Sequence, residues 1–200
     1  MELILASTSP RRRQLLSEGG FVHSAMAPGV DDATLKWDPV TPPHQWTAAL
    51  ALLKGRAAVE QVGARAAHAV VLAADTIVVK DGLVLGQPMT EDEATRTLKT
   101  LESGTHMVMT GVSIVGGGRT VLFTDEASVR VGVIGDERIA AYVASGGWRG
   151  KAGAYNLFER LADGWPISYS GDPTTIMGLP MERLGPILRR MLDPTSEAAP

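Results

Sequence analysis

Residues 69–79 read AVVLAADTIVV, and this stretch decides the fold class. Its first six residues are a continuous apolar run, which is typical of a strand covered on both faces. We expect this strand to end at Asp75 and Thr76, before a second apolar run over residues 77–79. Because a strand covered on both faces needs helices on either side of its sheet, the stretch indicates an α/β fold.

The segments around this stretch alternate between strand-like and helical patterns. Ser9 followed by Pro10 predicts an N-cap and a helix start, and Thr90 with Glu93 forms a capping box. The expected helices cover residues 10–18, 44–62, 90–102 and 136–145; the other expected strands cover 2–6, 21–25, 83–85, 107–115 and 119–131, with a long loop over 28–43. Since a long hairpin follows the alternating part, we predict a mixed sheet.

The composition limits the class of protein. The 200 residues suffice for one domain, which we place at residues 1–192, with a flexible polar tail over 193–200. The absence of cysteine excludes disulfides and thiolate metal sites. Nineteen basic and 22 acidic residues give a net charge of −3, which offers no general field for nucleic acid. No apolar run reaches the ~20 residues of a membrane span, so we expect a cytoplasmic protein without nucleic-acid or membrane partners.

Residues 7–13 read STSPRRR and place three arginines in the first turn of a helix. Cations at this end oppose the helix dipole, each at a cost of about 0.3–1 kcal/mol. A bound anion would explain the placement, because backbone N–H groups, the hydroxyls of Ser7 and Ser9, and the guanidinium groups would all point at it. The pattern therefore indicates phosphate recognition, with a solvated basic turn as the alternative. No Walker motif accompanies it.

Three acidic residues and one lysine are further candidates. Asp75 lies where ligands bind in open α/β sheets, although a structural aspartate bonded to backbone N–H groups is the alternative. Asp31 and Asp32, in the long loop, add carboxylates of the kind that Mg²⁺ or Mn²⁺ prefers, and a solvated turn is the other interpretation of this pair. Lys54 can reach the same anion from its helix, although its spacing alone favours a surface lysine.

Six blocks of sequence carry a resemblance to a known family. They are LILASTSPRRR (3–13), AADTIVV (73–79), LGQP (85–88), HMVMTGV (106–112), GKAGAY (150–155) and MGLPMERL (177–184). In content, order and spacing the blocks resemble the Maf family, over nearly the whole chain. The resemblance implies an elongated mixed sheet flanked by helices, with two lobes and a central cleft, as in the inosine triphosphate pyrophosphatases. It also suggests a homodimer.

The resemblance further implies a nucleoside triphosphate pyrophosphatase. Such enzymes cleave the bond between the α and β phosphates and release a nucleoside monophosphate and pyrophosphate, with Mg²⁺ or Mn²⁺ as the expected cofactor. By the family's pattern, Asp75 would accept a proton, with a role as metal ligand left open beside it, and Lys54 would add a catalytic charge. The remaining assignments are phosphate binding by Ser7, Arg11 and Arg12 and metal binding by Asp32.

Base choice in the family is linked to three positions, which fall on Arg11, Thr76 and Phe158. Arg11 and Thr76 agree with the branch that acts on dTTP and UTP, which we favour. Phe158 agrees neither with that branch nor with the 7-methyl-GTP branch, so 7-methyl-GTP and other modified nucleotides are the alternative substrates. Gln87 stands where the family commonly has a phosphate-facing lysine. This departure leads to a second alternative, a weakly catalytic, nucleotide-binding regulator of septum formation.

Overall fold

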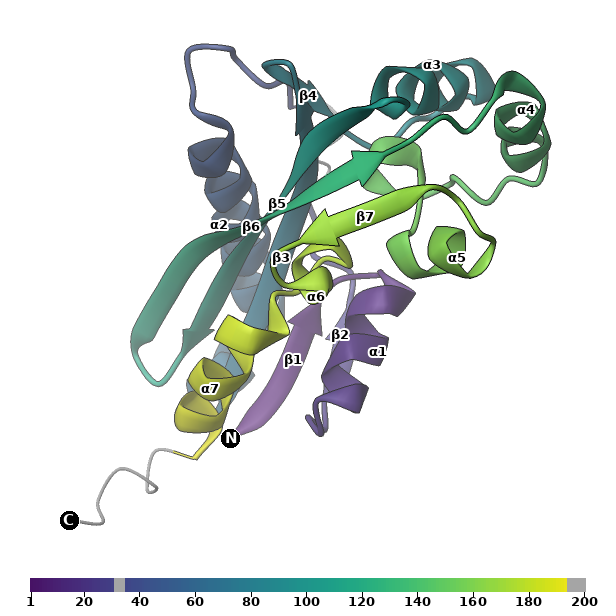
Figure 1. Cartoon of the computed structure of the whole chain (residues 1–200). Coiled ribbons are helices and arrows are strands. Elements are labelled where there is room, and N and C mark those ends of the chain that lie inside the picture. Colours follow the sequence, from purple (N-terminus) through teal and green to yellow (C-terminus); the bar gives the residue numbers. More distant parts are fainter. Residues whose placement is uncertain (31–34, 194–200) are drawn as a thin grey trace.

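The computed structural model describes residues 1–30 and 35–193 and has a mixed α/β fold (Figure 1). Its strands form one sheet in the order β2-β1-β3-β5-β6-β7, and β4 pairs with β3. The strands are β1 (Glu2–Ala6), β2 (Ser24–Met26), β3 (Ala69–Lys80), β4 (Leu83–Leu85), β5 (Gly104–Gly116), β6 (Arg119–Val131) and β7 (Ile167–Ser170). β1 runs parallel to β2 and β3, whereas the other neighbours are antiparallel, so the predicted mixed sheet is confirmed.

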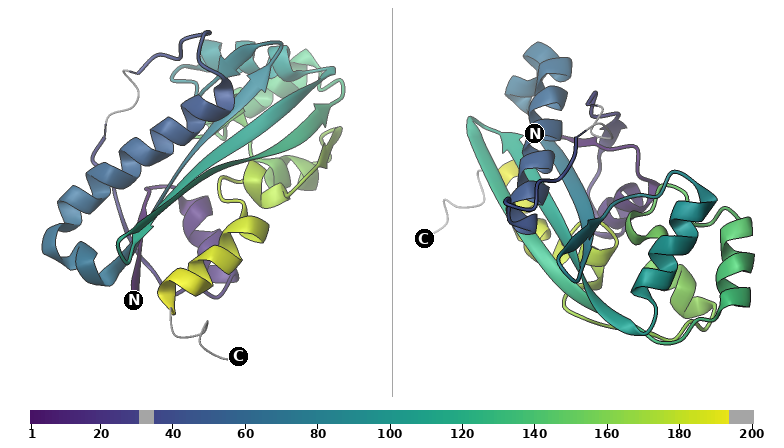
Figure 2. Two further views of the ribbon diagram at one scale, coloured as in Figure 1. Left: turned by 90° about the vertical axis from the view of Figure 1, so that its left-hand side faces the viewer. Right: turned by 90° about the horizontal axis from the view of Figure 1, so that it is seen from above.

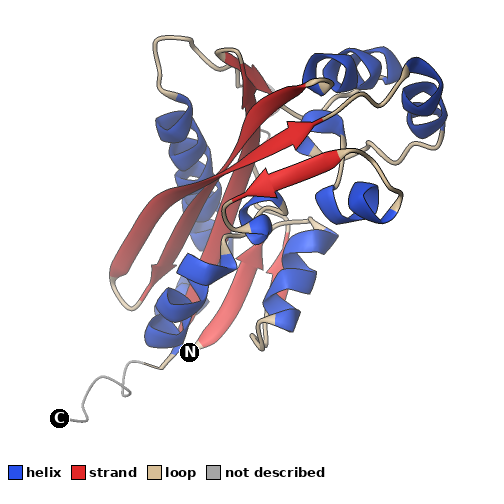
Figure 3. Ribbon diagram, viewed as in Figure 1, coloured by secondary structure: helices blue, strands red, loops and turns tan. Residues whose placement is uncertain are grey.

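Helices cover both faces of the sheet (Figures 2 and 3). They are α1 (Pro10–Glu18), α2 (Pro43–Val62), α3 (Glu91–Leu101), α4 (Asp136–Ala144), α5 (Leu157–Ala162), α6 (Pro173–Ile176) and α7 (Met181–Leu192), with 3₁₀ turns η1 (Gly63–His68) and η2 (Ala152–Ala154). α2 packs against β1 and β3 on one face. α1 and α7 pack against the opposite face of the same strands through Leu16 and Leu188, both fully buried.

A second core lies at the other end of the long strands. Leu98 of α3, Ile139 of α4 and Leu157 of α5 are buried there against Val108 of β5 and Val129 of β6. Figure 1 shows these three helices gathered at one end of the sheet, away from α7. The fold therefore has two lobes that share β3, β5 and β6, as expected from the family resemblance.

β3 is one strand of twelve residues, so the prediction of two short strands separated at Asp75 and Thr76 was wrong. The strand continues because β5 pairs with it without interruption, from Val71 to Val79. On its other side, β1 pairs with β3 only as far as Leu72, and β4 begins to pair at Val78. Residues 73–77 have no strand partner there among the described strands, which leaves a gap in the sheet beside Asp75.

β2 begins later than predicted, at Ser24 instead of residue 21. The reason is the C-terminus of α1, where Gly20 adopts φ +79° and the N–H of Phe21 donates to Leu16 O at 2.9 Å. This is a Schellman arrangement, which satisfies the last carbonyls of the helix. Phe21 is therefore held by the helix end and buried in the core under α1, and it is not available to the strand.

α2 lies unusually close to the sheet. A Cβ on Gly111 of β5 would stand 2.4 Å from the carbonyl oxygen of Thr47 in α2, and a Cβ on Gly55 of α2 would stand 2.7 Å from Ser113 Oγ. Both positions therefore require glycine for this approach. The close contact brings Lys54, the neighbour of Gly55 in α2, within reach of β3.

Two further expectations concern the limits of the domain. The predicted tail over residues 193–200 falls almost entirely outside the described residues, so its flexibility stays a prediction. Within residues 1–30 and 35–193, no helix combines the length and the hydropathy needed to cross a membrane.

Candidate active site

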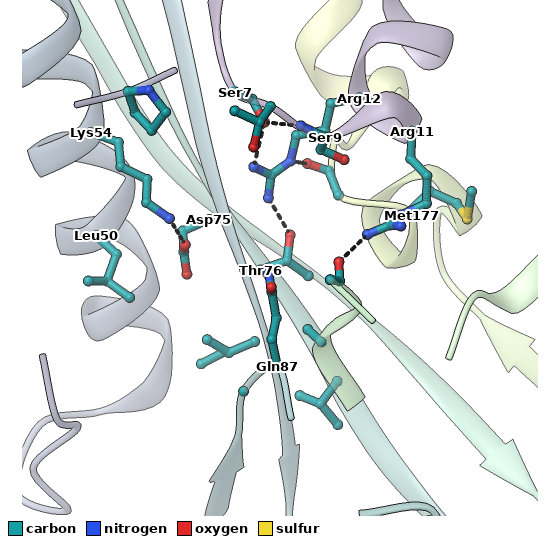
Figure 4. A pocket seen from close by; sticks show the side chains of 18 of the residues that line it. Ser7, Ser9, Arg11, Arg12, Leu50, Lys54, Asp75, Thr76, Gln87 and Met177 are labelled. Carbon is teal, nitrogen blue, oxygen red and sulfur yellow. Dashed lines mark hydrogen bonds and ion pairs between the residues drawn. The ribbon is translucent and has the colours of Figure 1, made fainter. Parts of the chain in front are cut away.

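A cleft of about 1130 Å³ opens at the gap in the sheet (Figure 4). The loop after β1 and the first turn of α1 line one side of it, α2 lines the other, and β3 runs between them. The cleft brings together eight of the residues singled out in the sequence, namely Ser7, Ser9, Arg11, Arg12, Lys54, Asp75, Thr76 and Gln87. Segments from Ala6 to Gly178, far apart in the chain, thus meet at one opening.

The charge of the cleft is strongly one-sided. Among the described residues that line it, the basic side chains are Arg11, Arg12, Lys54 and Arg149, whereas Asp75 is the single acidic one. Low-dielectric walls around an excess of positive charge concentrate the electrostatic potential. The cleft therefore favours a polyanion, such as a polyphosphate, over a neutral ligand.

Arg12 connects three segments of the cleft. Its Nη1 donates to Ala74 O of β3 at 2.7 Å and to Ser7 Oγ at 3.3 Å. Its Nη2 donates to Thr76 Oγ1 at 3.0 Å, and its Nε donates to Gly178 O, after α6, at 2.9 Å. Such a guanidinium both supplies positive charge and fixes the relative positions of the loop, the strand and α6.

Arg11 is attached more loosely than Arg12. Its Nη2 donates to Gly150 O, in the loop before η2, at 3.0 Å. Burial lowers the pKa of the Arg11 guanidinium, and the charges of Glu159 and Tyr142 act in the opposite direction. Arg11 thus reaches from α1 across to the lobe that contains α4 and α5. Arg13, by contrast, is exposed and does not line the cleft.

Lys54 and Asp75 form an ion pair on the α2 side of the cleft. Lys54 Nζ lies 2.5 Å from Asp75 Oδ1, and the two side chains are 12% and 11% exposed. Oδ2 of Asp75 accepts no hydrogen bond from any described residue. Lys54 is therefore a cleft residue and not the surface lysine that its spacing alone favoured, and Asp75 is bonded to a side chain and not to backbone N–H groups.

The start of α1 differs in one detail from the sequence-based expectation. Ser9 stands at the N-cap position, but its hydroxyl makes no capping hydrogen bond to the helix. Instead, the N–H of Ser9 donates to Ser7 Oγ at 3.2 Å, which orders the loop that enters the helix. The hydroxyl of Ser9 lines the cleft instead of satisfying the helix, as an anion site at a helix N-terminus requires.

Two predicted residues are not placed in the cleft. Phe158 is 44% exposed in the first turn of α5 and does not line the cleft, so it neither packs inward nor faces the ligand space. The predicted metal ligand Asp32 lies outside the described residues, together with its neighbour Asp31. Asn156 is the residue near Phe158 that does line the cleft, and it is buried.

From the sequence, Asn156 is noted only as part of the stretch 156–159 that departs from the dTTP/UTP branch, and Arg149 is not singled out, although both flank the GKAGAY block at residues 150–155. Asn156 Oδ1 accepts the N–H of Glu159 at 3.1 Å and so caps α5, which fixes the orientation of its amide. Arg149 extends over the ring of Trp148, with its Cζ 4.5 Å from the ring centroid. Proximity to a quoted block was the sequence signal for Arg149, and for Asn156 the departure from the branch pattern was a second one.

The cleft contains few ligands for a metal ion. In the part of the chain that the structure describes, no group of three or more histidines, cysteines or acidic residues could hold one. A single carboxylate, Asp75, nevertheless suits the binding mode of Mg²⁺ in which one or two carboxylates act together with substrate phosphates. The donors among the described residues fit an ion that arrives with a polyphosphate, and by themselves they do not form a complete metal site.

Below the cleft, His106 and Tyr155 form a buried pair. His106 Nε2 lies 2.8 Å from the hydroxyl oxygen of Tyr155, a residue that lines the cleft. Burial lowers the pKa of His106 to about 4, with a smaller contribution from Lys80, and burial also raises the pKa of Tyr155. The imidazole is therefore neutral at physiological pH, and its Nδ1 has no hydrogen-bond partner among the residues that the structure describes.

The sequence profile of Maf-like proteins matches residues 2–191 of this chain. The chain belongs to the Maf family. Its match extends from β1 to α7 and so includes both lobes of the sheet and every described residue of the cleft. The six quoted sequence blocks all lie within this range.

Named relatives resemble this Maf protein over most of their length. A protein of Symbiobacterium thermophilum, named dTTP/UTP pyrophosphatase, is 41% identical over 182 residues, which cover 91% of this chain and 90% of the relative. A protein of Shewanella frigidimarina with the same name is 36% identical, and the match covers 98% of this chain and 100% of the relative. A third, from Caulobacter vibrioides, is 37% identical, and the match covers 90% of each chain. Among solved structures, the Ham1 protein of Staphylococcus aureus has a TM-score of 0.42 and 14% identity, covering 66% of this chain and 72% of its own.

Proposed function

We propose that this Maf protein hydrolyses the α–β phosphoanhydride bond of nucleoside triphosphates. The observation that carries the proposal is the position of Asp75, the single described carboxylate of the cleft, opposite the basic start of α1. Relatives that are 36–41% identical to this chain are named dTTP/UTP pyrophosphatases, and these names support the same reaction. The products are a nucleoside monophosphate and pyrophosphate.

Substrate binding relies on the positive charge of the cleft. A nucleoside triphosphate carries about four negative charges, and Arg11 and Arg12 at the start of α1 provide charge-assisted hydrogen bonds for them. Ser7 and the backbone N–H groups of the helix start add neutral donors. Gln87, which lines the cleft, offers an amide where the family commonly has lysine, so the two arginines have a larger share of the charge neutralisation.

Asp75 activates the attacking water in this proposal. Its Oδ2 accepts a proton from the water while the water oxygen forms a bond to the α phosphorus. The bond from the α phosphorus to the bridging oxygen breaks, and its electrons leave with pyrophosphate. Lys54 holds Oδ1 at 2.5 Å and so orients the carboxylate, and Arg11 and Arg12 stabilise the charge that grows on the leaving group.

A divalent metal ion, Mg²⁺ or Mn²⁺, completes the proposal as a cofactor. Asp75 would hold it together with phosphate oxygens of the substrate, and Asp32 is a further proposed ligand from outside the described residues. When bound, the ion neutralises phosphate charge and polarises the phosphoryl group.

We propose dTTP and UTP as the preferred substrates. The names of the relatives support this preference, as does the agreement of Arg11 and Thr76 with the dTTP/UTP branch. Asn156, which lines the cleft, is a proposed determinant of base choice, and Phe158, which the family's pattern links to base choice, is a weaker one because it does not line the cleft. Homodimer formation, a cytoplasmic location and the absence of a nucleic-acid partner are further proposals, which size-exclusion chromatography with light scattering, cell fractionation and a DNA-binding assay would test.

The decisive experiment is a product assay over a panel of nucleotides. The purified full chain is incubated with dTTP, UTP, the other common nucleoside triphosphates and 7-methyl-GTP, with Mg²⁺, with Mn²⁺ and with a chelator. We expect pyrophosphate and the monophosphate from dTTP and UTP, in the presence of metal only. Release of orthophosphate would contradict the cleavage position. Turnover of 7-methyl-GTP alone would overturn the base preference, and binding without any turnover would favour the regulator of septum formation.

A further inference from the structure

A row of polar residues crosses the sheet beside the cleft. Thr76 of β3 pairs with Thr110 of β5, and Thr110 pairs with Asp125 of β6. α6 lies over this row, since Thr175 Oγ1 donates to Asp125 Oδ2 at 2.5 Å. Thr110 and Thr175 are completely buried. Three strands and one helix therefore meet at a set of polar groups, of which Thr110 and Thr175 are closed to solvent and Thr76 borders the cleft.

The direction of each hydrogen bond in this row follows from the number of hydrogens. Thr110 Oγ1 lies 2.8 Å from the carbonyl oxygen of Thr175, which only accepts, so the one hydroxyl hydrogen of Thr110 is used there. At the 2.9 Å contact between Thr110 Oγ1 and Thr76 Oγ1, Thr76 must consequently donate. The oxygen of Thr76 then accepts from Arg12 Nη2 at 3.0 Å. The chain of donors runs in one direction, from Arg12 to Thr175.

The same chain returns to Arg12 through the backbone. Thr175 belongs to α6, and Gly178, three residues later, accepts from Arg12 Nε at 2.9 Å. Arg12, Thr76, Thr110 and the segment 175–178 thus form a closed ring of hydrogen bonds and covalent bonds. Hydrogen bonds in a low-dielectric interior strengthen one another, so loss of one member weakens the hold on the others.

We propose that Thr110 is a positioning residue for Arg12. Its hydroxyl donates to Thr175 O and thereby forces Thr76 to present a lone pair, not a hydrogen, toward the guanidinium group. Arg12 is then held against Ser7 and Ala74 at the phosphate-binding side of the cleft. Thr110 does not line the cleft and acts only through Thr76. The proposal concerns substrate binding and rests on the proposed nucleotide pyrophosphatase activity.

The test compares two substitutions that differ by one hydroxyl. Thr110→Val keeps the shape and removes the hydrogen bonds, and Thr110→Ser keeps the hydroxyl. With dTTP, Thr110→Val should raise KM by about tenfold while kcat changes by less than about threefold, because Thr76 is no longer fixed as the acceptor of Arg12 and the hold on the guanidinium group weakens by about the value of one hydrogen bond. Thr110→Ser should stay within about twofold of wild type in KM. Thr47→Val is the matched control, since Thr47 is also a completely buried threonine that donates to a backbone carbonyl, Pro43 O, but is not connected to Arg12.

Thr76→Val provides a second variant, because it removes the hydroxyl between Thr110 and Arg12 from a site that is only half-buried. It should raise KM as Thr110→Val does. The KM of the double variant should not exceed that of either single variant, because all three proteins lack the same series of hydrogen bonds. Thermal unfolding verifies that each protein is folded at the assay temperature. Unchanged KM in Thr110→Val, failure of Thr110→Ser to restore binding, or additive effects in the double variant would each overturn the proposal.

Binding measurements separate this proposal from the proposed activity. Inorganic tripolyphosphate is titrated into wild type, Thr110→Val and Thr110→Ser by calorimetry, without any turnover. If wild type hydrolyses no nucleotide, the pyrophosphatase proposal fails, while weaker tripolyphosphate binding by Thr110→Val alone still supports the positioning role. Equal binding by all three proteins would refute the positioning role, whatever the activity.

Discussion

Lys54 Nζ of α2 lies 2.5 Å from Asp75 Oδ1 of β3, while the next residue along β3, Thr76, bonds to Arg12 on the other side of the sheet. Successive side chains of a strand point to opposite faces. Two adjacent residues of β3 therefore connect the α2 side and the α1 side of the cleft. This arrangement requires the gap at residues 73–77, because a neighbouring strand there would close the space between the two sides.

The ion pair predicts an asymmetric effect of substitutions on stability. Lys54→Met leaves the carboxylate of Asp75 without its cation in a nearly buried position, which should lower the free energy of unfolding by about 2–3 kcal/mol. The double variant Lys54→Met/Asp75→Asn should recover at least half of that loss, because no charge remains to be solvated. Urea unfolding of the wild type, Lys54→Met and the double variant measures this. A double variant less stable than Lys54→Met would refute the electrostatic cause.

Arg11 and Arg12 should respond differently to removal. Arg11→Ala and Arg12→Ala should each raise KM by the equivalent of roughly 2–3 kcal/mol, because a charge-assisted hydrogen bond to phosphate is lost. Arg12→Ala should also lower the free energy of unfolding by about 1–3 kcal/mol, since Ala74 O and Gly178 O lose their donor. Arg11→Ala should lower the free energy of unfolding by no more than about 1 kcal/mol, because Arg11 donates to one backbone acceptor, Gly150 O.

Steady-state kinetics and urea unfolding on the same preparations distinguish these outcomes. Arg13→Ala is the matched control, because Arg13 lies in the same helical turn but is exposed and outside the cleft. KM values equal to wild type in both cleft variants would exclude the arginines from substrate binding. Equal stability losses in Arg11→Ala and Arg12→Ala would contradict the structural role assigned to Arg12.

Base choice should depend on Asn156 more than on Phe158. Asn156 is buried, lines the cleft and has its amide fixed by the cap of α5, whereas Phe158 is exposed. We expect Asn156→Gly to change the ratio of kcat/KM for UTP and 7-methyl-GTP by about tenfold, and Phe158→Gln to change it by less than about threefold. Competition kinetics with both nucleotides measure the ratio. A larger change in Phe158→Gln would assign base choice to Phe158, as the family resemblance implies.

The buried histidine predicts how stability depends on pH. The folded pKa of His106 is about 4, compared with 6.5 for an ordinary histidine. Between these values the unfolded chain binds a proton that the folded chain does not, so stability falls as the pH is lowered from 6.5 toward 4. The loss attributable to His106 should reach about 3 kcal/mol at the lower limit. Urea unfolding at several pH values should show a flatter profile for His106→Gln; parallel profiles would contradict this.

Most of the fold could be predicted from the sequence, because the local patterns agree with the tertiary structure. The apolar run at 69–74, the capping box of Thr90 and Glu93, and the hairpin around Gly117 were all found in the structure where the patterns indicated. Phe21 was assigned to a strand because an apolar residue after two glycines fits either a strand or a helix end. Only the hydrogen bond to Leu16 decides between them.

The site could be predicted in its residues but not in its geometry. The pattern of Asp75 and Thr76 indicated the end of a strand, since a carboxylate after an apolar run interrupts the burial expected inside a sheet. The strand continues because β5 pairs with it from Val71 to Val79, and no local signal near Asp75 contains that information. Likewise, Thr110 is one of several threonines in the chain, and only the register between β3 and β5 places it against Thr76.

The most direct test compares wild type with Asp75→Asn on one nucleotide. Binding of dTTP is measured by calorimetry in the presence of Ca²⁺ as a substitute for Mg²⁺, and turnover is measured by pyrophosphate release with Mg²⁺. In the proposed site, Asp75 activates the water and the start of α1 provides the hydrogen-bond donors for the phosphates. Turnover by Asp75→Asn should therefore fall by about 10²–10⁴-fold, while its affinity for dTTP stays within about tenfold of the wild-type value. Turnover equal to that of wild type would remove Asp75 from the reaction and contradict the proposed active site.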